Sequence, residues 1–258
     1  MLNLAKATAL WLHQIHSNVY SLYKVKQCGL KPSSPLTAKE RRFYLRLRST
    51  LQGENLIVYD IGAAKGHVSK CLAKLNNVLE IYAFEPIPDV FIKLKAQVKS
   101  IPKIHCYNIA LGNFSGSSLI NISKKSDSSS LLPMASLHTD QFPDTETINQ
   151  IEISVECLDA FILKHQLPQP HLIKIDVQGF EKNVIEGGHE TLTKARYCVL
   201  EMSFKSLYQG SPLFDEIYQI LKNLGFVLIG VSDPLTGKSG EQLQIDGIFE
   251  NIRFRATK

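Results

Sequence analysis

A short segment around residue 60 constrains the fold of this chain more than any other. The apolar run Leu56–Tyr59 ends in Asp60 and is followed by a turn that contains Gly62 and Gly66. A buried parallel strand that leads through a tight turn into a helix has this pattern. Glycine lets the backbone of such a turn approach a ligand closely, because it has no side chain in the way. The segment therefore predicts a ligand-binding strand–turn–helix unit.

The spacing of this turn and a second strand end indicate the ligand. The spacing D-x-G-x-x-x-G differs from the G-x-G-x-x-G of dinucleotide-binding turns and favours S-adenosylmethionine (SAM). A second strand-like run ends in Glu85, 23 residues after Gly62. An acid at this place can accept hydrogen bonds from both ribose hydroxyls of an adenosine. The residues expected to bind the cofactor are Asp60, Gly62, Ala63, Gly66, Glu85 and Asn108, which ends the third strand.

The chain continues as alternating strand-like and helical patterns, which predict an α/β fold with a doubly wound, mostly parallel sheet. The last two strand-like runs, 226–232 and 247–254, have no helix between them, so we expect an antiparallel hairpin. A seven-stranded sheet closed by such a hairpin is the Rossmann-like fold of SAM methyltransferases. The other expected strands are 55–60, 80–85, 104–108, 171–176 and 196–202, with helices at 65–75, 88–99, 179–186 and 213–224.

We expect two parts, a basic N-terminal helical extension over 1–50 and a catalytic domain over 51–258. Residues 1–50 hold nine Lys or Arg and one acid, a net +8, so the overall +5 leaves −3 for the catalytic domain. A mildly acidic domain argues against general nucleic-acid binding. Apolar residues at helical spacing from Trp11 to Val25 predict an amphipathic helix that packs on the domain or on a second copy of the chain. A peripheral membrane contact through this helix remains an alternative.

The cysteines and the apolar runs bear on the compartment. Five cysteines without a paired spacing favour reduced thiols and a cytoplasmic protein. The extension lacks the pattern of a signal peptide, and no apolar run reaches the length of a transmembrane helix.

The segment 112–157 interrupts the alternation and reads as an insertion. Two strand-like runs, Ser117–Ser123 and Ile151–Cys157, flank a serine-rich stretch at Ser126–Ser130. A long segment of this kind inside a compact domain is often functional. We expect it to form a lid over the acceptor site.

These residues resemble the FkbM-type methyltransferases over about 55–254. The strongest part is Ile173–Glu181, which is followed by Gly187. The family usually has Glu where this chain has Gln178 and Asn where it has Ala64. The resemblance implies SAM-dependent O-methylation of a hydroxyl on a sugar, a glycolipid or a polyketide-like small molecule. It is also carried by Asp60–Ala63, Ala83–Pro86, Ala110–Gly112, Ser128–Leu131, Leu158–Asp159, Val199–Glu201 and Ile245–Phe249.

Two acids are the candidates for catalysis. Asp176 ends the strand next to the first strand, where ligands bind in open α/β sheets. There it can accept the proton of the hydroxyl that is methylated. Glu181 follows in the first turn of a helix. Asp176 and Glu201 on neighbouring strand ends are also candidates to hold Mg²⁺, although the sequence leaves the metal unknown.

Two other functions remain open at this stage. A nucleic-acid methyltransferase is disfavoured because the tetrapeptide N/D-P-P-aromatic is absent where the chain reads Asp176–Gly179. A non-catalytic protein that keeps the SAM fold and binds a partner through the basic extension is the other alternative.

Overall fold

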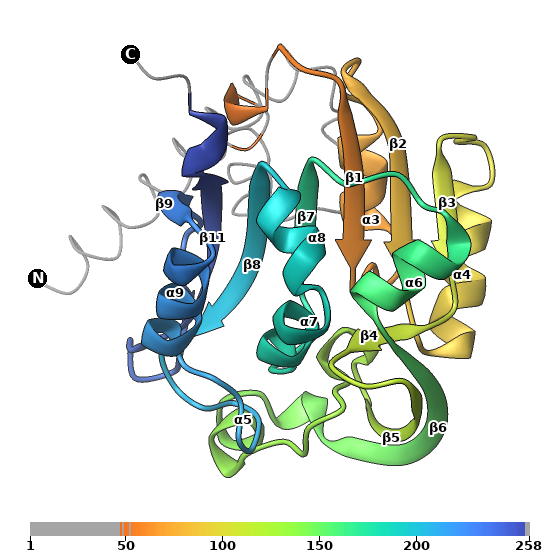
Figure 1. Cartoon of the computed structure of the whole chain (residues 1–258). Coiled ribbons are helices and arrows are strands. Elements are labelled where there is room, and N and C mark those ends of the chain that lie inside the picture. Colours follow the sequence, from red (N-terminus) through yellow and green to blue (C-terminus); the bar gives the residue numbers. More distant parts are fainter. Residues whose placement is uncertain (1–46, 48, 52, 256–258) are drawn as a thin grey trace, which may run out of the picture. The chain divides into compact units, whose positions relative to one another are not determined.

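The structure is a computed structural model that describes residues 47, 49–51 and 53–255 (Figure 1). The chain divides into two units, Met1–Gly53 and Glu54–Lys258. In the first unit, residues 47, 49 and 50 have helical backbone. The amphipathic helix expected near Trp11 lies outside the described residues.

The second unit is built on one large sheet, which has eight strands in the part of the chain that the structure describes. The strand order is β10-β11-β8-β7-β1-β2-β3, and β9 pairs with β11. The central strands run parallel, whereas β11 is antiparallel to both β8 and β9. This arrangement confirms the predicted fold and its C-terminal hairpin. The strands are β1 Leu56–Ile61, β2 Val78–Phe84, β3 Ile104–Tyr107, β7 Leu172–Ile175, β8 Tyr197–Ser203, β9 Phe226–Val231, β10 Leu235–Thr236 and β11 Gln242–Asn251.

Helices cover both faces of this sheet (Figure 1). Helices α3 (His67–Leu72) and α4 (Pro88–Val98) cover one face. The other face carries α6 (Leu158–His165), α7 (Glu181–Gly187), α8 (His189–Lys194) and α9 (Phe214–Asn223). Of these, α6 and α8 were not expected. Within the described ranges, no helix combines the length and the apolar character needed to cross a membrane.

The insertion folds as a small second sheet. Strands β4 (Ala110–Gly112), β5 (Gly116–Ser123) and β6 (Thr147–Cys157) pair in the order β4-β6-β5. This sheet lies at the carboxyl ends of the central strands, together with α5 (Ser136–Gln141) (Figure 1). Short 3₁₀ turns occupy Ser126–Ser128, Pro143–Thr145 and Ile252–Phe254. The insertion therefore stands at the sheet edge where ligands bind in open α/β folds.

Candidate active site

The glycine turn after β1 is packed tightly between two neighbouring strand ends. The backbone nitrogens of Gly62 and Ala63 donate to Phe84 O at 3.1 and 2.9 Å, which joins the turn to β2. Gly62 has φ +76°, and a Cβ there would lie 1.8 Å from the backbone oxygen of Asp176. Only glycine fits such a contact, because any side chain would collide with the backbone that follows β7. Gly66 has a similar φ of +77°, and a Cβ there would lie 2.6 Å from Leu94.

Glu85 lies next to this turn at the end of β2. Its two carboxylate oxygens accept hydrogen bonds from the backbone nitrogens of Ala64 (3.0 Å) and Ile87 (2.9 Å). Burial raises the pKa of Glu85 to about 7, although these two bonds act to lower it. Asn108 donates through its side-chain amide to the backbone oxygens of Glu85 and Pro86, both at 2.9 Å, and so fixes the segment after β2.

Asp60 is fully buried and contacts other parts of the protein. Its Oδ2 accepts a hydrogen bond of 2.6 Å from Ser69 Oγ in α3, and its Oδ1 lies 3.4 Å from Lys174 Nζ. These contacts join β1 to the helix after the turn and to β7. The role in cofactor binding expected for Asp60, Ala63 and Gly66 stays a prediction; the contacts of Asp60 and the packing at Gly66 show how they shape the turn.

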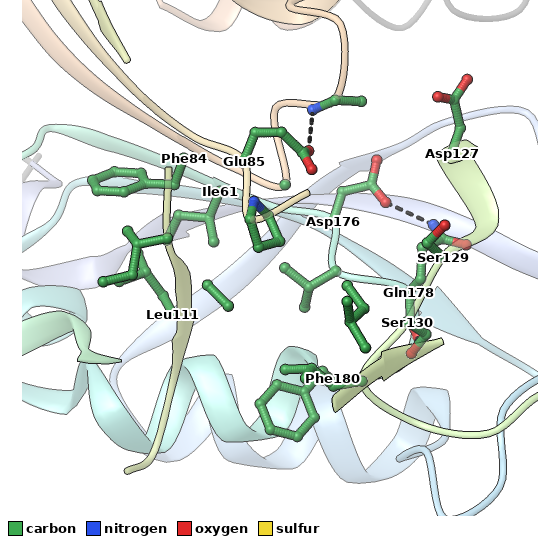
Figure 2. Close-up of a pocket in the computed structure, with 18 of the residues that line it drawn as sticks. Ile61, Phe84, Glu85, Leu111, Asp127, Ser129, Ser130, Asp176, Gln178 and Phe180 are labelled. Carbon is green, nitrogen blue, oxygen red and sulfur yellow. Dashed lines mark hydrogen bonds between the residues drawn. The ribbon is translucent and has the colours of Figure 1, made fainter. Parts of the chain in front are cut away.

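One cavity opens at the carboxyl ends of β1, β2 and β7 (Figure 2). Gly62, Ala64 and Glu85 line it from the glycine turn and β2, and Asp176 lines it from the end of β7. The insertion supplies another wall. The residues of that wall are Ile109, Ala110, Leu111, Ile120, Ser126, Asp127, Ser129, Ser130 and Leu131.

Asp176 stands at the end of β7 beside a buried lysine. Its backbone nitrogen donates to Ile61 O at 3.0 Å, and its side chain is 37% exposed. Lys174 Nζ lies 3.2 Å from Asp176 Oδ2. Burial acts to lower the pKa of Lys174, but the carboxylates of Asp176 and Asp60 outweigh it and the pKa is raised. Sequence analysis had not placed Lys174 in the site, although strand alternation puts it on the same face as Asp176.

Glu181 is placed differently from Asp176. It is 4% exposed, and its Oε1 accepts hydrogen bonds of 3.1 Å from the backbone nitrogens of Val177 and Gly179. Burial raises its pKa to about 7 against these bonds. The catalytic role expected for Glu181 stays a prediction, and its contacts favour stabilisation of the turn after β7.

Glu201 lies on β8, two residues before the strand ends, so it is not the strand-end acid that the sequence indicated. Burial raises its pKa well above the ordinary value, and the charges of Asp176 and Asp246 add to this effect. Its Oε2 accepts hydrogen bonds from the side-chain amides of Gln178 (3.1 Å) and Gln244 (3.0 Å).

The Mg²⁺ that Asp176 and Glu201 were expected to share does not fit these residues. The amide nitrogen of Gln178 lies between the two carboxylates, 2.8 Å from Asp176 Oδ1 and 3.1 Å from Glu201 Oε2 (Figure 2 shows the first contact). An amide N–H donates hydrogen bonds and cannot ligate a cation. Among the residues described here, no group of three or more His, Cys, Asp or Glu could hold a metal ion.

The serine-rich loop of the insertion contacts the site at three points. Lys65 in the glycine turn forms an ion pair of 3.2 Å with Asp127. Ser130 Oγ donates to Gln178 O at 2.6 Å, and Tyr208 OH donates to Ser128 O at 3.0 Å. Sequence analysis missed Tyr208, because it follows β8 in a stretch without a motif. The lid predicted for this loop agrees with its place over the cavity.

Comparison with known proteins gives the family. A family model for the methyltransferase FkbM domain matches residues 60–228, more than half of the chain. The chain belongs to the FkbM methyltransferase family. The predicted resemblance and the predicted enzyme class, a SAM-dependent O-methyltransferase, are thereby confirmed. The glycine turn and Glu85 fit this cofactor, because they line one cavity at the strand ends where the fold binds its ligands.

Three similar proteins illustrate the range of the family. The 2-O-methyltransferase NoeI of Sinorhizobium fredii is 25% identical over 203 residues, which cover 76% of this chain and 82% of NoeI. The hexuronic acid methyltransferase AglP of Haloferax volcanii is 25% identical over 183 residues, which cover 68% of this chain and 70% of AglP. A solved methyltransferase FkbM of Methylobacillus flagellatus is 12% identical with a TM-score of 0.49. That match covers 81% of this chain and 53% of the solved protein, so this chain spans about half of its length.

Proposed function

We propose that this protein transfers a methyl group from SAM to a hydroxyl of a sugar, with Asp176 as the general base. One observation carries this proposal. Glu85 and Asp176, from the strands on either side of β1, line the same cavity, and Gly62 lies between them. A cofactor site and an acid that can accept a proton are thus placed at one opening.

The residues on each side have separate tasks in this proposal. Gly62 and Ala64 shape the backbone around the cofactor, and the carboxylate of Glu85 accepts hydrogen bonds from its ribose hydroxyls. Bound SAM supplies a methyl group on a positively charged sulfur, so the carbon–sulfur bond breaks as the new carbon–oxygen bond forms. Asp176 accepts the proton that the acceptor hydroxyl loses, which makes the oxygen a better nucleophile. The loop around Ser129 closes the cavity and keeps water away from these groups.

Lys174 supports the task of Asp176. It lies 3.2 Å from Asp176 Oδ2, and its positive charge favours the ionised carboxylate that a base requires. Asp176 Oδ1 accepts from Gln178 on the other side. The carboxylate is therefore held from both sides, while more than a third of the side chain stays exposed.

A sugar is the acceptor class that the similar proteins favour. NoeI is named as a 2-O-methyltransferase and AglP as a hexuronic acid methyltransferase. An acidic sugar offers two places for a methyl group, a hydroxyl that gives an ether and a carboxylate that gives an ester. The general base proposed here is needed for the hydroxyl, because an alcohol is a poor nucleophile and a carboxylate is already ionised.

The test uses SAM labelled in its methyl group, the full chain, and a panel of neutral sugars, hexuronic acids, glycolipids and tRNA. We expect label in a sugar product that survives mild alkali, because methyl ethers resist the hydrolysis that removes methyl esters. Alkali-labile label would contradict hydroxyl methylation, and label in tRNA would favour the nucleic-acid alternative. SAM binding by calorimetry without transfer to any acceptor would favour the non-catalytic alternative.

We also propose the setting of this reaction. A cytoplasmic location is supported by the free thiols of Cys71, Cys106, Cys157 and Cys198, the cysteines that lie within the described residues. The basic extension before residue 47 is where we propose a homo-oligomer contact or, as the alternative, a peripheral membrane contact. Truncation of the first 46 residues, followed by light scattering and vesicle sedimentation, tests both contacts.

A further inference from the structure

The side chain of Gln178 occupies the centre of a group of acids. Its amide nitrogen is 2.8 Å from Asp176 Oδ1 and 3.1 Å from Glu201 Oε2. An amide –NH₂ group carries two hydrogens, so each carboxylate receives its own hydrogen bond. Gln178 therefore connects the end of β7 to a buried residue on β8.

The direction of this amide is set by its other contacts. Its oxygen, Oε1, accepts a hydrogen bond of 2.8 Å from Tyr208 OH. A flipped amide would point its oxygen at the two carboxylates and its nitrogen at the tyrosine oxygen, which is unfavourable next to ionised Asp176. The backbone of Gln178 is also fixed, because it has φ +55° and its carbonyl accepts from Ser130 Oγ at 2.6 Å. The nitrogen thus has one stable place, between the acids.

This place is the one that a bridging cation would need. Two carboxylates at neighbouring strand positions can share Mg²⁺ only if their oxygens face a common space. Here that space holds a hydrogen-bond donor. Lys174 Nζ lies at 3.2 Å from the other oxygen of Asp176, and Gln244 Nε2 donates to Glu201 at 3.0 Å. Both acids are therefore satisfied by nitrogen donors of the protein itself.

We propose that Gln178 is a positioning residue that takes the place of a bridging cation, so that Asp176 is held for methyl transfer without a metal. This inference rests on the proposed function of Asp176. It makes Gln178 a specificity-determining position for metal dependence: replacement by a carboxylate would remove the donor and add oxygen ligands in the same space. The other charged groups around this space are Lys174, Glu181, Glu201 and Asp246.

The experiment compares wild type, Gln178→Glu and Gln178→Met in the full chain. Methionine has nearly the same length as glutamine but has no amide and no charge, so it is the matched control for loss of the bridge alone. Three quantities are measured for each protein. They are the SAM dissociation constant by calorimetry, the heat of Mg²⁺ titration, and kcat on the accepted sugar with EDTA or with added Mg²⁺.

In EDTA we expect both variants to lose about 10- to 100-fold in kcat, the size expected for lost hydrogen bonds to charged groups. Their SAM dissociation constants stay near the wild-type value. Mg²⁺ raises kcat of Gln178→Glu by about tenfold or more, because it joins three carboxylates there. It leaves wild type and Gln178→Met unchanged, and only Gln178→Glu shows saturable heat of Mg²⁺ binding. A merely structural role would impair both variants alike, with no rescue by the cation.

Three results would overturn the proposal. One is a wild-type enzyme that loses activity in EDTA and regains it with Mg²⁺. Another is Gln178→Met with the wild-type kcat. The third is Gln178→Glu that neither binds nor responds to Mg²⁺. The SAM and Mg²⁺ titrations need no acceptor, so failure of the sugar assay with intact SAM binding would count against the proposed function and not against this inference.

Discussion

The cofactor side and the acceptor side of the cavity are built by different means. On the cofactor side, the turn at 62–66 and the segment 84–87 hold each other mainly through backbone atoms, as in the bonds from Gly62 and Ala63 to Phe84 O. On the acceptor side, side chains from separate parts of the chain meet around Gln178, including Ser130, Glu201 and Tyr208. Backbone contacts tolerate most side-chain changes, whereas a side-chain network fails when one member is lost.

Glu85 and Glu181 make this contrast quantitative, because they share the same local chemistry. Each accepts two backbone N–H groups of the turn next to it, and burial raises the pKa of each to about 7. Glu85 lines the cavity, whereas Glu181 lies behind the turn after β7. Substitutions at the two positions should therefore separate ligand binding from stability.

The largest effect is expected for Asp176→Asn on the acceptor side. The change keeps the shape of the side chain but removes its ability to accept a proton. General-base assistance contributes about 10²- to 10⁴-fold, so we expect kcat to fall by that amount. The SAM dissociation constant, measured by calorimetry, should change little, because the cofactor side stays intact.

An exposed acid provides the control for Asp176→Asn. Asp89 lies in the first turn of α4 and is exposed, so Asp89→Asn should keep kcat within about twofold, the usual range for surface changes. An Asp176→Asn enzyme that turns over within a few-fold of wild type would rule out the base and direct attention to Glu181.

The next effect concerns stability and its pH dependence, through Glu181→Gln. In the folded protein burial raises the pKa of Glu181 from 4.5 to about 7, so the folded state holds this proton more firmly than the unfolded state does. Its contribution to the free energy of unfolding is full below pH 4.5 and is lost as the pH rises through 7. A raised pKa of this size corresponds to about 3 kcal/mol.

Urea unfolding at pH 5 and pH 8 checks this prediction. Wild type should be less stable at pH 8, and Glu181→Gln should reduce that difference, because Gln Oε1 can still accept both backbone bonds without a buried charge. Glu216→Gln, at an exposed position on α9, should leave the difference as it is. Equal pH dependence in wild type and Glu181→Gln would show that Glu181 does not titrate in this range.

The same contrast explains what could be predicted from sequence. The first strand, Gly62 and Glu85 are close in the chain and obey local rules of strand, turn and spacing, so the cofactor side was recognised. Lys174 was within reach, since strand alternation places it with Asp176. Tyr208 and the bridge from Gln178 to Glu201 were not, because they depend on tertiary contacts between segments that carry no mutual pattern. The same reason applies to α6, whose position was set by packing on the sheet.

The third effect is on the cofactor side, through Glu85→Gln. The amide would place its –NH₂ against one of the two backbone N–H groups that the carboxylate now accepts, at Ala64 or Ile87. Loss of charge-assisted bonds costs about 1.5–3 kcal/mol each, so SAM should bind about 10- to 100-fold more weakly. Calorimetry measures this, with Glu181→Gln as the matched control that keeps wild-type affinity. Equal affinity of wild type and Glu85→Gln for SAM would remove Glu85 from the cofactor site.

The smallest effect is expected where the two sides meet, at the ion pair of Lys65 with Asp127. The pair joins the glycine turn to the serine-rich loop at 3.2 Å, and both side chains are partly or largely exposed to solvent. Exposed pairs contribute about 0.2–1 kcal/mol and are screened by salt. We therefore expect Lys65→Met and Asp127→Asn each to raise the acceptor KM less than about fivefold, and only at low salt.

A double-mutant cycle turns this pair into a test of the whole comparison. If the cofactor side and the acceptor side are separate structures joined by a weak contact, the coupling energy between Lys65→Met and Asp127→Asn stays below about 1 kcal/mol in the acceptor KM. The SAM dissociation constant should show no coupling. A larger coupling, or one that appears in SAM binding, would mean that closure of the loop also organises the cofactor side, and the two sides would then have to be treated as one unit.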